Sequence, residues 1–182
     1  MKQVPLTIPA IIKEFPYHAE LKQSILSAIE NQKEIDHLVQ DKDHDITRCD
    51  WRTERHNPHR EWLNIFRPRL FNYLEEWCKD TKYDGFTITE MWFQQYANVG
   101  SHHGWHIHGS NFTFVYYLDF PEGSPKTQMI DPVTREEIEF DVKEGDILSF
   151  PSMVIHRAPP NHGTAMKTII SWNLDITLKN NY

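Results

Sequence analysis

The chain has 182 residues, of which 39% are hydrophobic and 13% aromatic, and this is enough for one domain with a buried core. The net charge of −7 argues against a surface built throughout to bind nucleic acid, and no stretch approaches the length of a membrane span. The amino terminus lacks the apolar run of a signal peptide, and the two cysteines, Cys49 and Cys78, lie in no metal-binding spacing. We therefore expect a soluble, cytoplasmic protein with reduced thiols.

The first 84 residues are predicted to form a helical support region. Apolar residues recur at helical spacing from about Tyr17 to Asn31, and again between Trp62 and Trp77. Pro68 interrupts the second pattern and is expected either to kink that helix or to start a new one. The polar run 41–45 between the two helices is read as a solvated loop, since nothing in it supplies the rigid geometry of a metal site.

Residues 85–178 are predicted to form the β-rich core of the same domain. The expected strands are 86–97, 111–120, 126–130, 138–142, 146–150, 154–157 and 166–178. Short strands separated by turns favour a sandwich or jelly roll. The fold class is therefore α+β, mainly β, with the helices packed on the sheet.

Three histidines are the strongest chemical signal in this core. His106 and His108 are separated by one residue, so on an extended strand both point to the same side, and His156 comes from a later strand. Three imidazoles gathered on one side of a metal leave coordination positions open, which is typical of a catalytic site. His102 and His103 precede the pair in what reads as a flexible loop, and either is an alternative ligand, although substrate or solvent contact is the commoner role.

A basic and aromatic segment lies between residues 48 and 69. It contains six arginines together with Trp51, His56 and Trp62, a composition that suits a nucleic acid or an acidic peptide. Asp50, Glu54 and Glu61 lie in the same segment, so we favour arginines paired with carboxylates, and a nucleic-acid partner is not expected.

The core resembles the double-stranded β-helix shared by cupins and by Fe(II)/2-oxoglutarate-dependent oxygenases, and most closely the small bacterial and viral oxygenases related to prolyl 4-hydroxylases. The resemblance covers roughly residues 85 to 176. The segments that carry it are 96–100, 105–108, 113–118, 145–151 with His156, and 167–173. It is more specific than a histidine pair alone because spacing, turns and flanking strands agree.

The resemblance implies Fe(II) held by His106, His108 and His156, with 2-oxoglutarate and O2 as co-substrates. It also implies that Lys167 and Tyr96 hold the far carboxylate of 2-oxoglutarate. Asn173 shares the polar face of the last strand with Lys167, and a polar face inside a barrel implies a ligand. The implied reaction converts 2-oxoglutarate to succinate and CO2 and hydroxylates an unactivated C–H bond.

The sequence departs from this family at two positions. His108 stands where such oxygenases usually have a carboxylate ligand, so three neutral ligands leave the charge of the ion uncompensated and Fe(II) should bind less tightly. Lys167 stands where arginine is usual, and a lysine orients a carboxylate less strictly than a guanidinium fork does. If Lys167 instead lay on an edge strand, it would simply meet water.

Three readings of function follow. The leading one is a 2-oxoglutarate-dependent hydroxylase acting on a peptidyl proline, another protein side chain or a small molecule. The second is a three-histidine, cupin-type dioxygenase that needs no 2-oxoglutarate and gives Lys167 no role. The third is a metal-binding β-barrel without catalysis. The sequence leaves the substrate, the native metal and the oligomeric state open.

Overall fold

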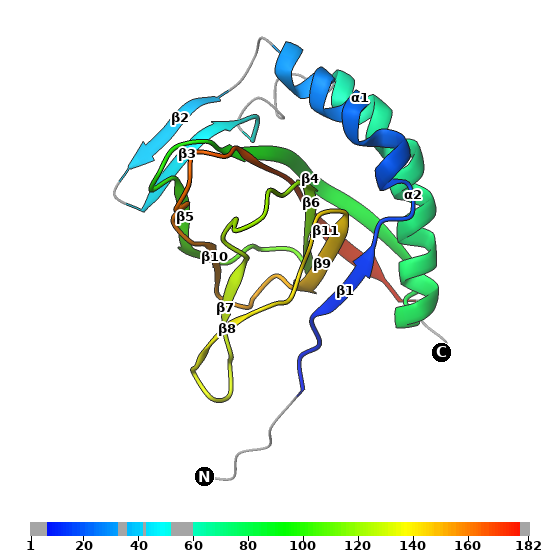
Figure 1. The fold of residues 1–182 in the computed structure, drawn as a ribbon. Coiled ribbons are helices and arrows are strands. Elements are labelled where there is room, and N and C mark those ends of the chain that lie inside the picture. Colours follow the sequence, from blue (N-terminus) through cyan, green and yellow to red (C-terminus); the bar gives the residue numbers. More distant parts are fainter. Residues whose placement is uncertain (1–6, 33–35, 42, 52–59, 179–182) are drawn as a thin grey trace.

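The structure is a computed structural model that describes residues 7–32, 36–41, 43–51 and 60–178. These residues form one antiparallel sheet of eleven strands that curls on itself, with two helices beside it (Figure 1). The strands are β1 (Ile11–Glu14), β2 (Asp36–Asp41), β3 (His44–Cys49), β4 (Gly85–Tyr96), β5 (His102–His106), β6 (Phe112–Asp119), β7 (Gln128–Ile130), β8 (Glu137–Glu139), β9 (Asp146–Pro151), β10 (His156–Ala158) and β11 (Lys167–Thr177).

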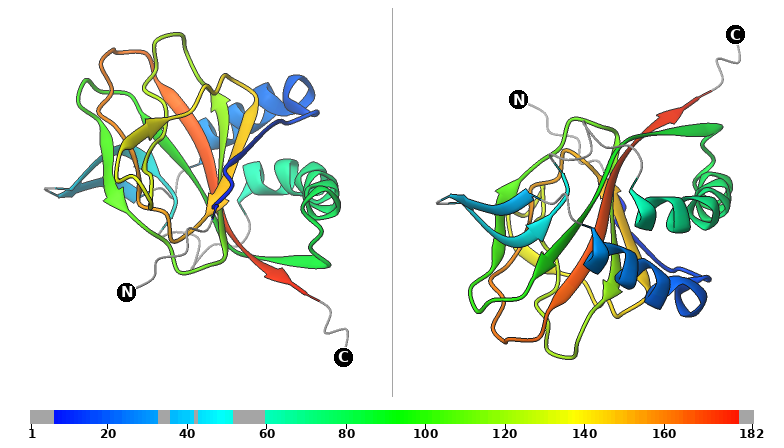
Figure 2. Two further views of the ribbon diagram at one scale, coloured as in Figure 1. Left: turned by 90° about the horizontal axis from the view of Figure 1, so that it is seen from below. Right: turned by 90° about the horizontal axis from the view of Figure 1, so that it is seen from above.

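The spatial order of the strands is β1-β9-β6-β11-β4-β3-β5-β10-β7-β8, with β2 paired to β3 alone. Strand β11 therefore lies in the middle of the sheet, between β6 and β4, and its pairing with β4 continues along all of its eleven residues (Figure 2). The expected mainly β architecture is confirmed: a curled antiparallel sheet accompanied by two helices.

The two helices are α1 (His18–Asn31) and α2 (Glu61–Thr81), and Figure 1 shows them side by side against one face of the curled sheet. The first agrees with its prediction to within one residue. The second helix continues through Pro68. The alternative in which the proline starts a new helix is therefore wrong, and one helix contains it. It ends at Lys82, whose φ of 63° places this residue in the left-handed region common after helix ends.

Aromatic rings fill the space between the helices and the sheet. Phe66 of α2 stacks on Tyr116 of β6, with 5.4 Å between ring centroids, and Trp172 of β11 stacks on Phe114 of β6 at 4.9 Å. The Trp77 indole N–H donates to Ser149 Oγ on β9 over 3.1 Å, which satisfies its polar atom inside the core. The helices thus cover the outer side of the sheet and leave its other side for the site.

A buried carboxylate joins the segment before α2 to the sheet. Asp50 is fully buried and accepts hydrogen bonds from the backbone N–H of Phe93, from the Arg60 guanidinium and from the Trp62 indole, each at 2.9 Å. Burial raises the pKa of Asp50, and the Arg60 charge and these donors oppose that rise. Because Phe93 lies between two residues that face the site, this contact also fixes the strand that carries them.

The front half contains more β structure than its sequence indicated. Strands β1, β2 and β3 were missed, and the expected solvated loop at 41–45 is wrong: Asp41 ends β2, and His44 begins β3. The backbone carbonyl of Asp43 accepts a hydrogen bond from Gly104 N–H over 2.8 Å, so this turn is tied to β5. In the described residues, neither helix is long and apolar enough to cross a bilayer.

Candidate metal centre

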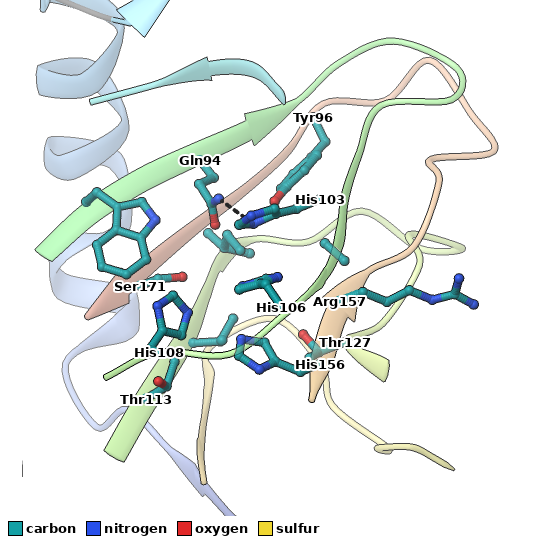
Figure 3. Close-up of a pocket in the computed structure, with 14 residues that line it drawn as sticks. Gln94, Tyr96, His103, His106, His108, Thr113, Thr127, His156, Arg157 and Ser171 are labelled. Carbon is teal, nitrogen blue, oxygen red and sulfur yellow. Dashed lines mark hydrogen bonds between the residues drawn. The ribbon is translucent and has the colours of Figure 1, made fainter. Parts of the chain in front are cut away.

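Three imidazoles converge at one end of the curled sheet (Figure 3). One ligand atom from each of His106, His108 and His156 lies within 4.8 Å of the others, and in the described part of the chain they are the single such group of histidine, cysteine or carboxylate side chains. His106 ends β5 and His156 begins β10, and these two residues are direct cross-strand partners. The structure therefore brings together the three residues that the sequence selected.

His108 does not lie on the same strand as His106, contrary to expectation. Strand β5 ends at His106, and the backbone N–H of His108 donates instead to the carbonyl of Ser152 over 3.0 Å. The chain therefore stays close to the turn before β10 after leaving its strand, and His108 still faces the same centre.

Two of the three rings are held so that Nε2 is free. His106 Nδ1 lies 2.7 Å from the Gly104 carbonyl oxygen, and His156 Nδ1 lies 2.9 Å from that of Val154. A carbonyl oxygen only accepts, so the ring hydrogen must sit on Nδ1 in both. The Nε2 lone pairs of these two rings are therefore available to a metal, as in metal sites where the second ring nitrogen donates to a carbonyl.

The three rings are neutral near pH 7. Burial lowers the pKa of His106 and takes that of His156 well below the usual value. Burial, with a smaller contribution from His106, lowers the pKa of His108 to about 4. Neutral imidazole is the form that binds a metal ion, so the site needs no proton loss to accept one.

His103 belongs to β5 and is buried, so the expectation of a flexible loop at this position is wrong. Its ring stacks on His106 with 3.8 Å between centroids. The Gln94 side-chain amide nitrogen lies 3.2 Å from His103 Nδ1, so His103 accepts there and carries its hydrogen on Nε2. His102 Nδ1 donates to the Gly100 carbonyl over 2.9 Å, and neither ring joins the group of three.

A pocket with an empty volume of about 340 Å³, including its open mouth, lies over the three rings. Its lining includes side chains that sequence reasoning missed: Trp92, Gln94, Thr113 and Thr127. A signal for two of them was present, because Trp92 and Gln94 alternate with Tyr96 along β4 and so share its face.

Tyr96 lines this pocket and is fully buried. Within the described residues its phenol oxygen has no hydrogen-bond partner, and burial raises the Tyr96 pKa far above the usual value. A buried hydroxyl without a partner is costly, so a ligand atom that accepts its hydrogen would be stabilised here.

Lys167 lies next to Tyr96 but not on the pocket wall. Its Nζ is 4.7 Å from the centroid of the Tyr96 ring and donates to the Pro125 carbonyl over 2.9 Å. The side chain is buried, which lowers its pKa to about 8. Strand β11 is central, so the alternative of an edge-strand lysine in water is wrong.

Asn173, expected to bind a co-substrate, lies beside His108. Its Nδ2 lies 3.4 Å from His108 Nδ1 and 3.1 Å from a carboxylate oxygen of Glu90. Arg157 borders the pocket and also pairs with Glu137 over 3.2 Å.

The two tyrosines of β6, Tyr116 and Tyr117, do not line the pocket. Tyr116 lies 2.7 Å from His18 Nδ1 through its hydroxyl, and the Tyr117 hydroxyl donates to Thr127 over 2.7 Å. Part of the basic segment falls at residues 52–59, outside the described residues. Of its described arginines, Arg60 pairs with Asp50 and Arg69 with Glu20, as favoured from the sequence.

No family model matches the sequence, and no curated protein matches it either. Solved structures do match. A prolyl-4-hydroxylase from Pseudomonas putida is 14% identical with a TM-score of 0.68, covering 93% of this chain and 94% of that one. The viral collagen prolyl hydroxylase from Paramecium Bursaria Chlorella virus-1, solved as a 2OG complex, is 16% identical with a TM-score of 0.59 over 93% and 96% of the two chains.

A third match is a prolyl hydroxylase from Trichoplax adhaerens in complex with a peptide fragment of the hypoxia inducible factor oxygen degradation domain. It is 19% identical with a TM-score of 0.62, over 91% of this chain and 83% of that one. The three matches cover 91% to 93% of this chain. The chain thus has the fold of the Fe(II)/2-oxoglutarate oxygenases and is structurally similar to the prolyl hydroxylases among them.

Proposed function

We propose that this protein is an Fe(II)- and 2-oxoglutarate-dependent dioxygenase that hydroxylates an unactivated C–H bond. His106, His108 and His156 would hold the iron, and the fit rests on three neutral imidazoles gathered on one side of an open pocket. The bound iron and 2-oxoglutarate would supply the oxidising chemistry, with succinate and CO2 as products. The protein would orient the reactants and exclude water.

The observation that carries the 2-oxoglutarate assignment is the environment of Lys167. Its ammonium is buried, and no carboxylate of the described residues forms an ion pair with it. An unpaired buried cation is unfavourable, which makes this a place for the carboxylate of a ligand. Lys167 would exchange the Pro125 carbonyl for the far carboxylate of 2-oxoglutarate, while the Tyr96 hydroxyl donates to the same group.

For the substrate we propose a protein or peptide side chain, with a prolyl residue as the first candidate. The support is the fold shared with three prolyl hydroxylases, one of them solved with a bound peptide fragment. The exposed ring of Trp105, stacked on Arg157 at 4.3 Å beside the pocket, offers an apolar surface next to the opening. A small-molecule substrate is the alternative outcome of the same assay.

A second candidate function is a three-histidine dioxygenase that does not use 2-oxoglutarate. The observation in its favour is the ligand group itself, which contains no carboxylate. This second function differs from the first in that it gives the buried charge of Lys167 no role.

The test is to load purified protein with Fe(II) under argon, admit O2, and measure succinate formed from 2-oxoglutarate with and without proline-containing peptides. Peptide mass would be followed for the gain of one oxygen atom. We expect succinate from wild type and from the control His102→Ala, and none from His106→Ala. Oxygen uptake without succinate would instead support the three-histidine dioxygenase.

A further inference from the structure

His108 differs from the other two rings in the group that its Nδ1 faces. His106 and His156 each donate Nδ1–H to a backbone carbonyl. His108 Nδ1 lies 3.4 Å from the side-chain nitrogen of Asn173, which is an N–H donor. A donor facing Nδ1 favours a lone pair there and hence the hydrogen on Nε2, the nitrogen that the other two rings leave free.

The orientation of the Asn173 amide is set by Glu90. Glu90 accepts from Asn173 Nδ2 over 3.1 Å, and an ionised carboxylate has no hydrogen to give in return. The Thr113 hydroxyl donates to Asn173 Oδ1 over 3.0 Å. The Glu90 contact requires the amide nitrogen on the side of Glu90, which is also the side of His108, and the Thr113 hydroxyl, which can donate or accept, fits that orientation.

The sheet itself aligns these groups. Asn173 on β11 is the direct cross-strand partner of Glu90 on β4 and of Thr113 on β6, so the three side chains form a row across three neighbouring strands. Asn173 and Thr113 are 2% and 1% exposed, so water cannot readily replace their hydrogen bonds. The Thr113 hydroxyl also lies 2.8 Å from Ser152 Oγ, which extends the row.

We propose that Glu90, acting through the Asn173 amide, keeps the ring hydrogen of His108 on Nε2 in the metal-free protein. Glu90 and Asn173 are then positioning residues, and the metal meets two prepared imidazoles, His106 and His156, and a third that must change. The change is a turn of the amide together with a shift of the ring hydrogen: Nε2 gives its proton to solvent and Nδ1 takes one up from solvent. Asn173 Oδ1 then accepts from His108 Nδ1–H, and Asn173 Nδ2 donates to Thr113.

Glu90 opposes this turn of the amide, because the turn brings Asn173 Oδ1 against the carboxylate oxygens of Glu90. The carboxylate has to withdraw, or the metal has to compensate for the repulsion, before His108 offers Nε2. The effect of Glu90 and Asn173 on metal binding rests on the proposed metal centre. The ring hydrogen itself is a property of the metal-free protein and is measured without iron, 2-oxoglutarate or substrate.

The test is a long-range ¹H–¹⁵N correlation spectrum of the histidine rings in metal-free, ¹⁵N-labelled protein at pH 7.5, with His108→Gln used to assign the ring. We expect the Nδ1–H pattern for His106 and His156 and the Nε2–H pattern for His108. In Glu90→Gln the side-chain amide can donate to Asn173 Oδ1, so the Nδ1–H form of His108 should rise to at least half of the population.

Glu76→Gln is the matched control, because it makes the same change of charge on the exposed side of α2 and should leave the spectrum unchanged. An Nδ1–H pattern for His108 in wild type would overturn the proposal without any variant. Retention of the Nε2–H form in folded Glu90→Gln would overturn the role of Glu90. A protein that forms no succinate but shows the expected spectra would separate failure of the proposed function from failure of this inference.

Discussion

The buried charge of Lys167 gives a stability prediction that is independent of catalysis. Burial lowers its pKa from 10.5 to about 8. Between these values the unfolded chain binds more protons than the folded protein, so the Lys167 contribution to the free energy of unfolding rises with pH. Below pH 8 the full cost of the buried ammonium is present, and above pH 10.5 it is gone.

The magnitude follows from the shift. A difference of 2.5 pKa units corresponds to about 3 kcal/mol, of which roughly 2.5 kcal/mol is recovered between pH 7 and pH 10. Other lysines and tyrosines titrate over the same range, so the useful quantity is the difference in unfolding free energy between wild type and Lys167→Met. We expect this difference to move in favour of wild type by about 2 to 3 kcal/mol over that range.

The assay is urea unfolding of the metal-free proteins at pH 7, 8, 9 and 10. Lys143→Met serves as control because the Lys143 side chain is 71% exposed, and its difference from wild type should change little with pH. A Lys167→Met difference that stays constant within about 0.5 kcal/mol would refute the view that this ammonium is buried and uncompensated.

Three further predictions follow from the site and the fold. The affinity of the iron-loaded protein for 2-oxoglutarate, measured by calorimetry, should fall about tenfold from pH 7 to pH 9 as Lys167 loses its charge. In Lys167→Arg the affinity should change much less with pH, and an equal fall in both proteins would contradict the role of this charge. Asp50→Ala should lower the free energy of unfolding by about 3 to 5 kcal/mol in urea, because it removes the buried carboxylate that pairs with the Arg60 guanidinium and accepts the Phe93 backbone N–H, and a loss below about 1 kcal/mol would contradict this. Gly145→Ala should lower the melting temperature clearly more than Gly109→Ala. Gly145 has a φ of +89°, and a methyl group added there would lie 3.2 Å from the His18 ring, whereas a methyl group at Gly109 would meet open space. Equal effects on the melting temperature would count against the turn geometry.

The core of the fold was predictable because its strands carry a strong apolar signal. The residues of β6 and β9 are almost all buried, and the glycine and proline turns around them mark their ends. The helix at 18–31 was equally clear from its periodicity. The grouping of the three histidines followed from spacing together with a fold resemblance, and spacing alone would not have placed His156 beside His106.

The missed elements have weak local signals. Strands β2 and β3 are rich in charged and polar residues, so nothing in the 36–49 region marks a hairpin except its pairing with the rest of the sheet. Glu90 was missed, and His103 was expected in a loop, for a related reason. Their roles depend on cross-strand neighbours in register, and a single sequence does not contain the register. The division at residue 84 between a support region and a core stays a prediction.

The most direct test of the central claim is the visible charge-transfer band expected when 2-oxoglutarate chelates ferrous iron in the pocket. It would be recorded without oxygen on iron-loaded wild type, His156→Ala and Lys167→Ala. We expect a band in wild type, its loss in His156→Ala and a weaker band in Lys167→Ala. A folded, iron-loaded wild type that shows no band at saturating 2-oxoglutarate would contradict the assignment.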